Sequence, residues 1–217
     1  MILTGFGNIK CLCTRESPAG GTFAEKKVHP GALLLTHVYI LNMTTLKKGD
    51  GIRVIAPARS LMMSWISKEL KDLAIERFKD LGFNLSFGKH VNEMDDFSSS
   101  SIESRIEDIH EAFADPNVKM IITVIGGFNS NQLLRYLDYE LIKNNPKIFC
   151  GFSDITPLSN AIYAKTGLIT YSGPHFVSFG DPNPKSFDYI WEYFKKCLCE
   201  EESFEVIAAK EWSNDGF

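Results

Sequence analysis

The sequence lacks any apolar run long enough to cross a membrane. A membrane-spanning helix needs about 20 consecutive apolar residues, whereas the nearest candidate, residues 32–41, is far shorter and contains His37. This segment begins too far from the N-terminus for a secretory signal peptide, and no small-residue cleavage site follows it. We therefore expect a protein that is neither exported nor bound to a membrane.

The sequence also lacks an excess of positive charge. It has 23 Lys and Arg residues against 27 Asp and Glu residues, which gives a formal net charge of −4. Proteins that bind nucleic acids need a basic surface to neutralise phosphates, so nucleic acid is not an expected partner. A hydrophobic content of 44% with 23% charged residues is typical of a globular protein.

Cysteine is scarce, and its spacing fits no metal site. Two C-x-C pairs and one isolated residue make up the five cysteines, which are Cys11, Cys13, Cys150, Cys197 and Cys199. Neither pair has a second His or Cys pair at zinc-site spacing. We therefore expect no metal, and the odd number of thiols indicates a reduced, cytoplasmic location.

Residues 1–42 show no long helical or strand period and hold four Lys or Arg against two Asp or Glu. We predict that they form a poorly ordered N-terminal extension, with an arm packed on the body as the alternative. Residues 43–210 are predicted to form one α/β domain. Residues 211–217, in which Trp212 precedes polar residues, are predicted to begin a linker, although a Trp that lines a pocket is also compatible with the pattern.

Apolar segments with strand and helix spacing alternate from residue 52 onwards. Strands are predicted at residues 52–57, 83–87, 118–125, 148–152, 168–171 and 204–208, and helices at 64–81, 102–115, 130–138, 155–165 and 187–198. This alternation predicts an α/β fold with an open, mostly parallel sheet and helices on both faces, flavodoxin-like or class I amidotransferase-like. Binding sites in such sheets lie beyond the carboxyl ends of the strands.

The turn after residues 120–125 is the strongest functional signal. This apolar run stops at Gly126-Gly127, and Ser130 then opens an amphipathic segment. The pattern predicts a buried strand, a tight turn, an exposed serine and a helix. Main-chain N–H groups at such a turn can hold an oxyanion, which indicates acyl transfer with Ser130 as the nucleophile.

Two other interpretations of this turn remain open. It reads GGFNS rather than G-x-S-x-G, so Asn129 or Ser130 could instead be a helix N-cap. A turn that cradles a phosphate is the third option, but the lysine of a P-loop and the third glycine of a dinucleotide fingerprint are missing.

Further polar residues follow the next two predicted strands. Ser153 and Asp154 follow one strand, and His175 lies in the turn after the other. Asp154 could cap the following helix, or the pair could bind a substrate amine or support the turn at Ser130. His175 could act as a base for Ser130 with Asp154 orienting it, or it could be an ordinary loop histidine.

Four blocks of the sequence resemble the LD-carboxypeptidase family of serine peptidases, which includes the microcin-immunity proteins. They are GDGIRVIAPA at residues 49–58, the segment at 101–134 that ends in GGFNSNQLL, LDYELIKNNPKIFCGFSDIT at 137–156 and GLITYSGPHF at 167–176. The resemblance runs from about residue 43 to the C-terminus. The segment GGFNSNQLL resembles the microcin-immunity branch of the family more than the murein tetrapeptide branch.

The resemblance implies a role for each residue of the turn. Ser130 would be the nucleophile, with the N–H groups of Gly127 and Asn131 as the oxyanion hole and Gly126 as support. The family hydrolyses a peptide or amide bond next to a free carboxylate through an acyl-enzyme, without metal or cofactor. Its murein members act on peptidoglycan peptides, and its immunity members cleave an aminoacyl-nucleotide mimic. The expected partners are therefore a small peptide or peptide-nucleotide substrate and a second copy in a homodimer.

One part of the family pattern has no counterpart here. The family triad is Ser-Glu-His, and its Glu and His come from a second, C-terminal domain, whereas this sequence ends at Phe217. A serine without its base is a poor nucleophile, so we expect a truncated chain with little peptidase activity, and His175 becomes less favoured as the base. The alternative function is a non-catalytic α/β binding module that holds an anionic ligand at the Gly126–Gly127 turn.

Overall fold

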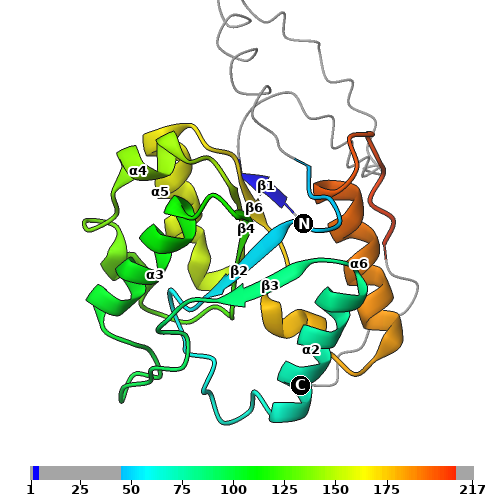
Figure 1. The fold of residues 1–217 in the computed structure, drawn as a ribbon, viewed down its shortest axis with the longest axis horizontal. Helices are drawn as coiled ribbons and strands as arrows, with labels where there is room; N and C mark the ends of the chain where they lie inside the picture. The colour runs from blue at the N-terminus through cyan, green and yellow to red at the C-terminus, as the bar shows by residue number, and fades with distance from the viewer. Residues whose placement is uncertain (1, 5–44, 209–217) are drawn as a thin grey trace, which may run out of the picture.

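The computed structural model describes residues 2–4 and 45–208 of the 217 residues (Figure 1). Its sheet has the strand order β1-β6-β5-β4-β2-β3, in which β1 is antiparallel to β6 and the other neighbours are parallel. The strands are β1 (Ile2–Thr4), β2 (Gly51–Ile55), β3 (Asn84–Phe87), β4 (Val118–Thr123), β5 (Ile148–Cys150) and β6 (Thr170–Ser172). The predicted open, mostly parallel sheet is confirmed.

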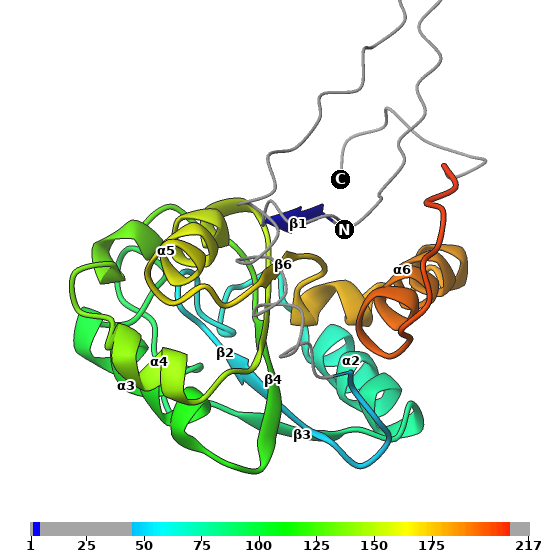
Figure 2. The ribbon, with the colours of Figure 1, turned by 90° about the horizontal axis from the view of Figure 1, so that it is seen from above.

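The helices cover both faces of this sheet. They are α2 (Lys68–Asp80), α3 (Ile102–Ala114), α4 (Tyr139–Asn144), α5 (Thr156–Thr166) and α6 (Pro184–Leu198), with short 3₁₀ segments η3 (Ser130–Leu133), η4 (Ser153–Ile155) and η5 (Phe176–Gly180). Figure 2 shows α3, α4 and α5 on one side of the sheet and α2 and α6 on the other. The result is the three-layer arrangement that strands separated by helices predict.

Strand β4 lies in the middle of the sheet and contributes to both cores. It pairs with β2 on one side and β5 on the other. Met120 and Ile122 belong to the core under α2 and α6, whereas Ile121 belongs to the core under α3, α4 and α5. Because successive side chains of a strand point to opposite faces, a continuous apolar run is what a central strand between two helix layers requires.

Three predicted elements differ from the structure. The helix expected at 130–138 is reduced to η3, because the side chain of Asp138 accepts a hydrogen bond from Leu141 N–H and starts α4 instead. Helix α2 begins at Lys68, after the cap Ser67, rather than at residue 64. The strand expected at 204–208 is wrong, since the main chain of Ile207 bonds to tyrosine hydroxyls of α6 rather than to a strand.

The predicted extension at residues 1–42 falls largely outside the described residues. Within it, only Ile2–Thr4 is described, and it forms the antiparallel edge strand β1 beside β6. Neither composition nor period in the sequence indicates this strand. The predicted linker at 211–217 also lies outside the described residues.

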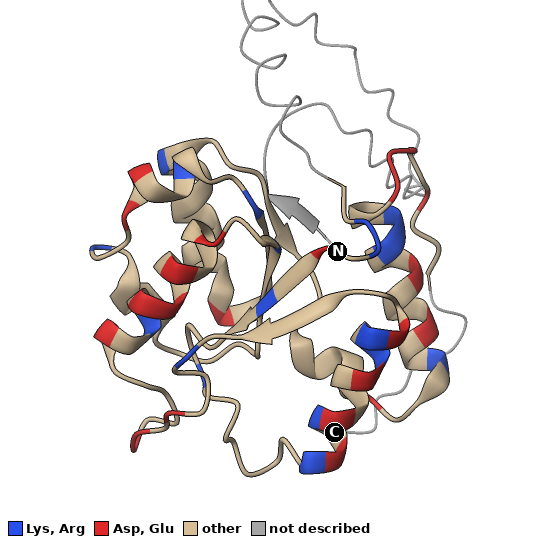
Figure 3. Ribbon diagram, viewed as in Figure 1, with Lys and Arg blue, Asp and Glu red and all other residues tan. Residues whose placement is uncertain are grey.

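The outer surface of the helices carries charges of both signs. Figure 3 shows acidic and basic residues interspersed along α2 and α6, whereas α3 carries mainly acidic residues. Within residues 2–4 and 45–208, no helix combines the length and apolar character needed to cross a membrane.

Phenylalanines fill the core between α2, η5 and α6. The rings of Phe78 and Phe179 have centroids 4.4 Å apart, and Phe179 meets Phe194 edge-on at 5.2 Å. All three side chains are buried. This cluster therefore joins three elements to one face of the sheet.

We predict that Phe78→Ala lowers the free energy of unfolding by about 3–5 kcal/mol, because the lost ring leaves a cavity between α2 and η5. Ile75→Ala on the same helix is the control. Its side chain is 38% exposed, so the expected loss is smaller, about 1 kcal/mol. Urea unfolding of both variants measures the difference, and equal losses would contradict this account of the core.

Candidate active site

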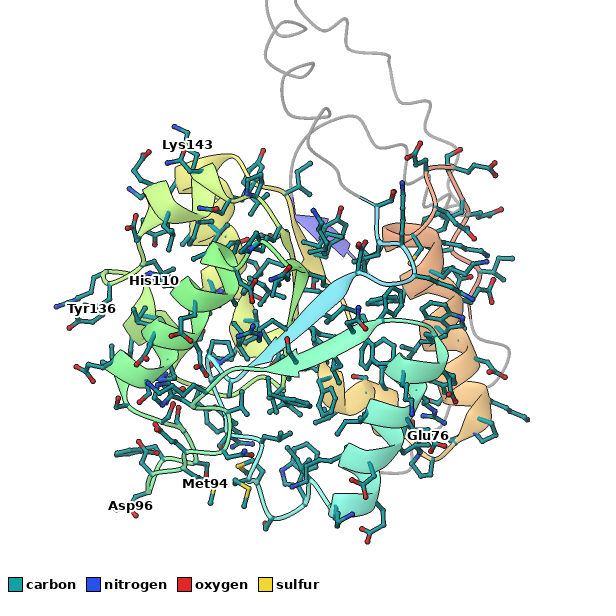
Figure 4. The ribbon with its side chains drawn as sticks, in the orientation of Figure 1. Glu76, Met94, Asp96, His110, Tyr136 and Lys143 are labelled. Atoms are coloured by element: carbon teal, nitrogen blue, oxygen red, sulfur yellow. The ribbon has the colours of Figure 1, made fainter. Side chains whose placement is uncertain are left out.

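The loops after β2, β4, β5 and β6 meet at the carboxyl edge of the sheet. Arg59 N–H approaches the carbonyl of Gly126 at 3.4 Å, and Val177 N–H approaches that of Val124 at 3.4 Å. Figure 4 shows Met94 and Asp96 beyond the ends of β2 and β3. This edge is where parallel sheets place their sites, and it contains the residues singled out in the sequence.

Two glycines let the central loop pass between its neighbours. A Cβ on Gly127 would lie 2.9 Å from the Cβ of Ala58, and a Cβ on Gly126 would lie 3.0 Å from the Cβ of Ser153. Both distances are shorter than ordinary side-chain contacts, so any larger residue would force the loops apart. The glycines therefore fix the distance between the loops after β2, β4 and β5.

Ser130 lies beneath this loop rather than on it. Its exposed fraction is 0%, its N–H donates to Asp154 Oδ2 at 3.0 Å, and its hydroxyl donates to the main-chain carbonyl of Asp154. The exposed serine expected from the sequence is therefore wrong in this structure. The reason is that η3 starts at Ser130 and turns its side chain toward the loop after β5.

The capping interpretations are also wrong. Asn129 is the N-cap residue of η3 but makes no side-chain capping bond. Helix α5 starts from Ile155 without a side-chain cap, because the carboxylate of Asp154 is used on Ser130 N–H. Asp154 thus binds Ser130 through both its side chain and its carbonyl.

Ser153 has a strained backbone and an exposed side chain. Its φ is +61°, in the left-handed region that residues other than glycine rarely adopt. Its hydroxyl has no hydrogen-bond partner among the described residues. Strained residues of this kind cost of order 1–3 kcal/mol and cluster at functional sites.

His175 is not the base of an internal triad. Its exposed fraction is 1%, its Nδ1 lies 2.8 Å from Thr123 Oγ1, and its ring stacks on Phe152 at 4.3 Å between centroids. Burial lowers the pKa of His175 to about 4, so the imidazole is neutral near pH 7. Asp154 is engaged with Ser130, so the predicted Ser130-His175-Asp154 chain of hydrogen bonds is not formed.

Arg105 contributes to the site without having been predicted. This buried residue of α3 donates to the carbonyls of Pro57 at 3.3 Å and Asn129 at 3.2 Å, and to Gln132 Oε1 at 2.8 Å. It therefore ties the end of β2 to the residue before Ser130. Its position at helical spacing from Ile102 and Ile109 was the available signal, since that spacing places an arginine on the buried face.

In the part of the chain that the structure describes, no three His, Cys, Asp or Glu side chains are grouped to hold a metal ion. The polar groups at the carboxyl edge are hydroxyls, carboxylates, guanidinium groups and main-chain N–H groups. Such groups can bind an anion or support acyl transfer.

Comparison with known proteins identifies relatives of the chain. Residues 52–173 match the model of the LD-carboxypeptidase N-terminal domain. YocD of Bacillus subtilis (strain 168) is 56% identical over 170 residues, which cover 78% of this chain and 51% of YocD. Microcin C7 self-immunity protein MccF of Escherichia coli is 40% identical over 144 residues, 65% of this chain and 42% of MccF.

Solved structures give the same grouping. The crystal structure of an MccF-like protein from Bacillus anthracis str. Ames matches with a TM-score of 0.67 at 59% identity, covering 71% of this chain and 46% of that protein. MccF in complex with glutamyl sulfamoyl guanosine matches with a TM-score of 0.74 at 35% identity. The match covers 79% of this chain and 51% of MccF. The chain spans about half the length of the curated relatives it matches first.

We predict that Arg105→Lys lowers the free energy of unfolding by about 2–4 kcal/mol, because a lysine cannot reach all three acceptors and leaves buried carbonyls unpaired. The control is Arg135→Lys on the exposed surface, for which the expected change is below about 0.5 kcal/mol. Chemical denaturation measures both, and an unchanged stability for Arg105→Lys would show that the turn does not depend on it.

We predict a loss of stability in mild acid that depends on His175. The pKa of His175 in the folded state, about 4, lies below its ordinary value of 6.5. As the pH falls through 6.5, the unfolded chain therefore binds a proton first. The stabilisation is complete above pH 6.5, and roughly 3 kcal/mol of it is lost as the pH falls toward 4.

Denaturation curves between pH 7 and pH 4 test this prediction. The His175→Gln variant should show a pH dependence that is shallower by that amount, whatever its absolute stability. Parallel curves for the parent and the variant would contradict the buried neutral histidine.

Proposed function

The chain belongs to the LD-carboxypeptidase family, and from that premise we propose that it is the nucleophile-bearing part of a serine carboxypeptidase-like hydrolase. The reaction is hydrolysis of a peptide or amide bond next to a free carboxylate. The observation that carries the proposal is the turn after β4, where two closely fitted glycines lead to Ser130 at the carboxyl edge of the sheet.

Ser130 acts as the nucleophile after its hydroxyl leaves the carbonyl of Asp154. Rotation about its Cα–Cβ bond turns Oγ from the loop after β5 toward the open edge. The hydroxyl gives its proton to the base as Oγ attacks the substrate carbonyl and forms a tetrahedral oxyanion. The oxyanion then collapses, the C–N bond breaks, and the amine leaves with that proton. Water hydrolyses the resulting acyl-enzyme.

Gly127 and Asn131 supply the oxyanion hole in this proposal. Neither N–H donates to another described residue, so both are available to a ligand. The N–H of Ser130 itself is used on Asp154. Asp154 therefore holds the backbone of the nucleophile, and Ser153 offers its free hydroxyl to the substrate.

The base comes from outside the described residues. Among residues 2–4 and 45–208, no histidine or glutamate makes a hydrogen bond to Ser130. His175 supports the end of β4 through Thr123 and does not take the proton. In the family that the sequence resembles, a Glu and a His from a further domain complete the triad with the nucleophilic serine.

The substrate is a murein peptide or an aminoacyl-nucleotide conjugate, the two classes on which the family acts. MccF was solved in complex with glutamyl sulfamoyl guanosine, which combines an amino acid, a sulfamoyl link and a nucleoside. Cys150 and Cys199 are free thiols, which fits a reducing cytoplasm. A homodimer, as the family resemblance implies, completes the proposal.

The burial of Ser130 favours a second candidate function. A serine whose hydroxyl and N–H are both satisfied within the fold can be a structural residue beneath an anion-binding turn. In that case the N–H groups of Gly127 and Asn131 hold an anionic ligand and no bond is cleaved.

A fluorophosphonate probe distinguishes the two functions. We predict covalent labelling of the chain, located on Ser130 by peptide mass spectrometry and abolished in Ser130→Ala. Ser186→Ala is the control, a serine of α6 to which the proposal gives no role, and it should keep at least about half of the labelling rate because its hydroxyl is not the nucleophile.

Hydrolysis of an aminoacyl sulfamoyl adenosine and of a murein tetrapeptide is followed on the same proteins. Labelling that survives Ser130→Ala would rule out Ser130 as the nucleophile. Absence of both labelling and hydrolysis, with tight binding of the sulfamoyl nucleotide, would favour the binding module instead.

A further inference from the structure

Arg59 lies at the carboxyl end of β2 with its side chain against the turn that precedes Ser130. Its Cγ would be 3.2 Å from a Cβ on Gly127, and its N–H approaches the carbonyl of Gly126 at 3.4 Å. Its guanidinium carbon lies 4.3 Å from the centroid of the Phe128 ring. The positive charge is therefore held beside the proposed oxyanion donor Gly127.

This guanidinium differs from the other half-buried or buried arginines that the structure describes. Arg53 pairs with Asp115, Arg77 donates to two main-chain carbonyls, and Arg105 donates to the turn. Arg59 makes no side-chain hydrogen bond to a described residue, and its Nε is buried without a partner. A buried donor without a partner costs about 1–3 kcal/mol of stability. The fold bears this cost at Nε of Arg59.

We propose that Arg59 binds the free carboxylate of the substrate through Nε and one terminal nitrogen. A carboxylate matches this fork of two parallel donors, and the paired form is the strong geometry of arginine recognition. The inference rests on the proposed function, which requires a carboxylate next to the cleaved bond, and it goes beyond that function by assigning the group that reads this carboxylate.

The positions of Arg59 and Gly127 agree with the chemistry of such a substrate. In a C-terminal residue, only the amide nitrogen and one Cα separate the carboxylate from the carbonyl that is attacked. A carbonyl oxygen on Gly127 N–H therefore leaves the carboxylate within reach of a side chain in contact with Gly127. Arg59 is that side chain.

Phe128 covers the guanidinium and can move away from it. Its ring is 79% exposed, so few contacts resist its rotation. The cation–π contact is worth about 0.5–1 kcal/mol at an exposed site, less than a charge-assisted pair of hydrogen bonds. The carboxylate thus replaces the ring as the partner of Arg59.

The side-chain Nε–H resonance of Arg59 reports binding directly. It is identified in ¹⁵N spectra of the whole chain by its loss in Arg59→Lys. N-acetyl-D-alanine should shift this resonance, whereas N-acetyl-D-alaninamide, which lacks the carboxylate, should leave it in place. AMP tests whether the anion is a phosphate instead.

Two variants measure the contribution of Arg59 to affinity. Arg59→Gln should weaken the binding of N-acetyl-D-alanine by about tenfold or more, because it removes a charge-assisted pair of hydrogen bonds. Arg135→Gln is the matched control, since Arg135 also lies beside an aromatic ring, Tyr136, at 5.9 Å. Figure 4 shows Tyr136 on a different side of the molecule from Met94 and Asp96, and this variant should bind within about twofold of the parent.

An unmoved Arg59 resonance, an equal shift with the amide, or a larger shift with AMP would overturn the proposal. So would equal losses in the two variants. A carboxylate-specific shift in a chain whose hydrolysis is insensitive to Ser130→Ala would instead leave the carboxylate site in place and remove the proposed function. The two failures are therefore distinguishable.

Discussion

Close packing of three loops at the carboxyl edge determines the geometry of everything around Ser130. The loop after β4 runs between the loops after β2 and β5 with no room for a Cβ on Gly127 or Gly126. This spacing brings the nucleophile candidate to Asp154 on one side and Arg59 to the turn on the other. A wider turn would move the N–H groups of Gly127 and Asn131 away from the hydroxyl of Ser130, and the sheet itself would stay unchanged.

Burial of Ser130 is compatible with catalysis on energetic grounds. Releasing the hydroxyl removes the hydrogen-bond partner of the Asp154 carbonyl, which costs about 1–3 kcal/mol. Enzymes lower reaction barriers by roughly 8–23 kcal/mol, and the release is a small part of that sum. The N–H of Ser130 donates to the Asp154 carboxylate, which holds the backbone of the turn independently of the hydroxyl.

Local sequence patterns predicted the fold well because its central strands are continuous apolar runs between helices of clear period. The segment after Ser130 was predicted poorly, since its apolar spacing fits a long helix while Asp138 starts a new one. The burial of Ser130 depends on Asp154, 24 residues further along the chain, and no local pattern contains that contact. The helical spacing of Arg105 indicates only that it is buried, and its contacts with Pro57 and Asn129 lie in distant loops that no local pattern contains.

The turn also limits how this protein can diversify. Gly126 and Gly127 have no space to change, Asn129 is held through its carbonyl by Arg105, and Ser130 is held by Asp154. Phe128 stands among them with a largely exposed ring, so mutation can alter it at little cost in stability. Phe128 is therefore the residue of this turn at which a substitution disturbs the fewest buried contacts.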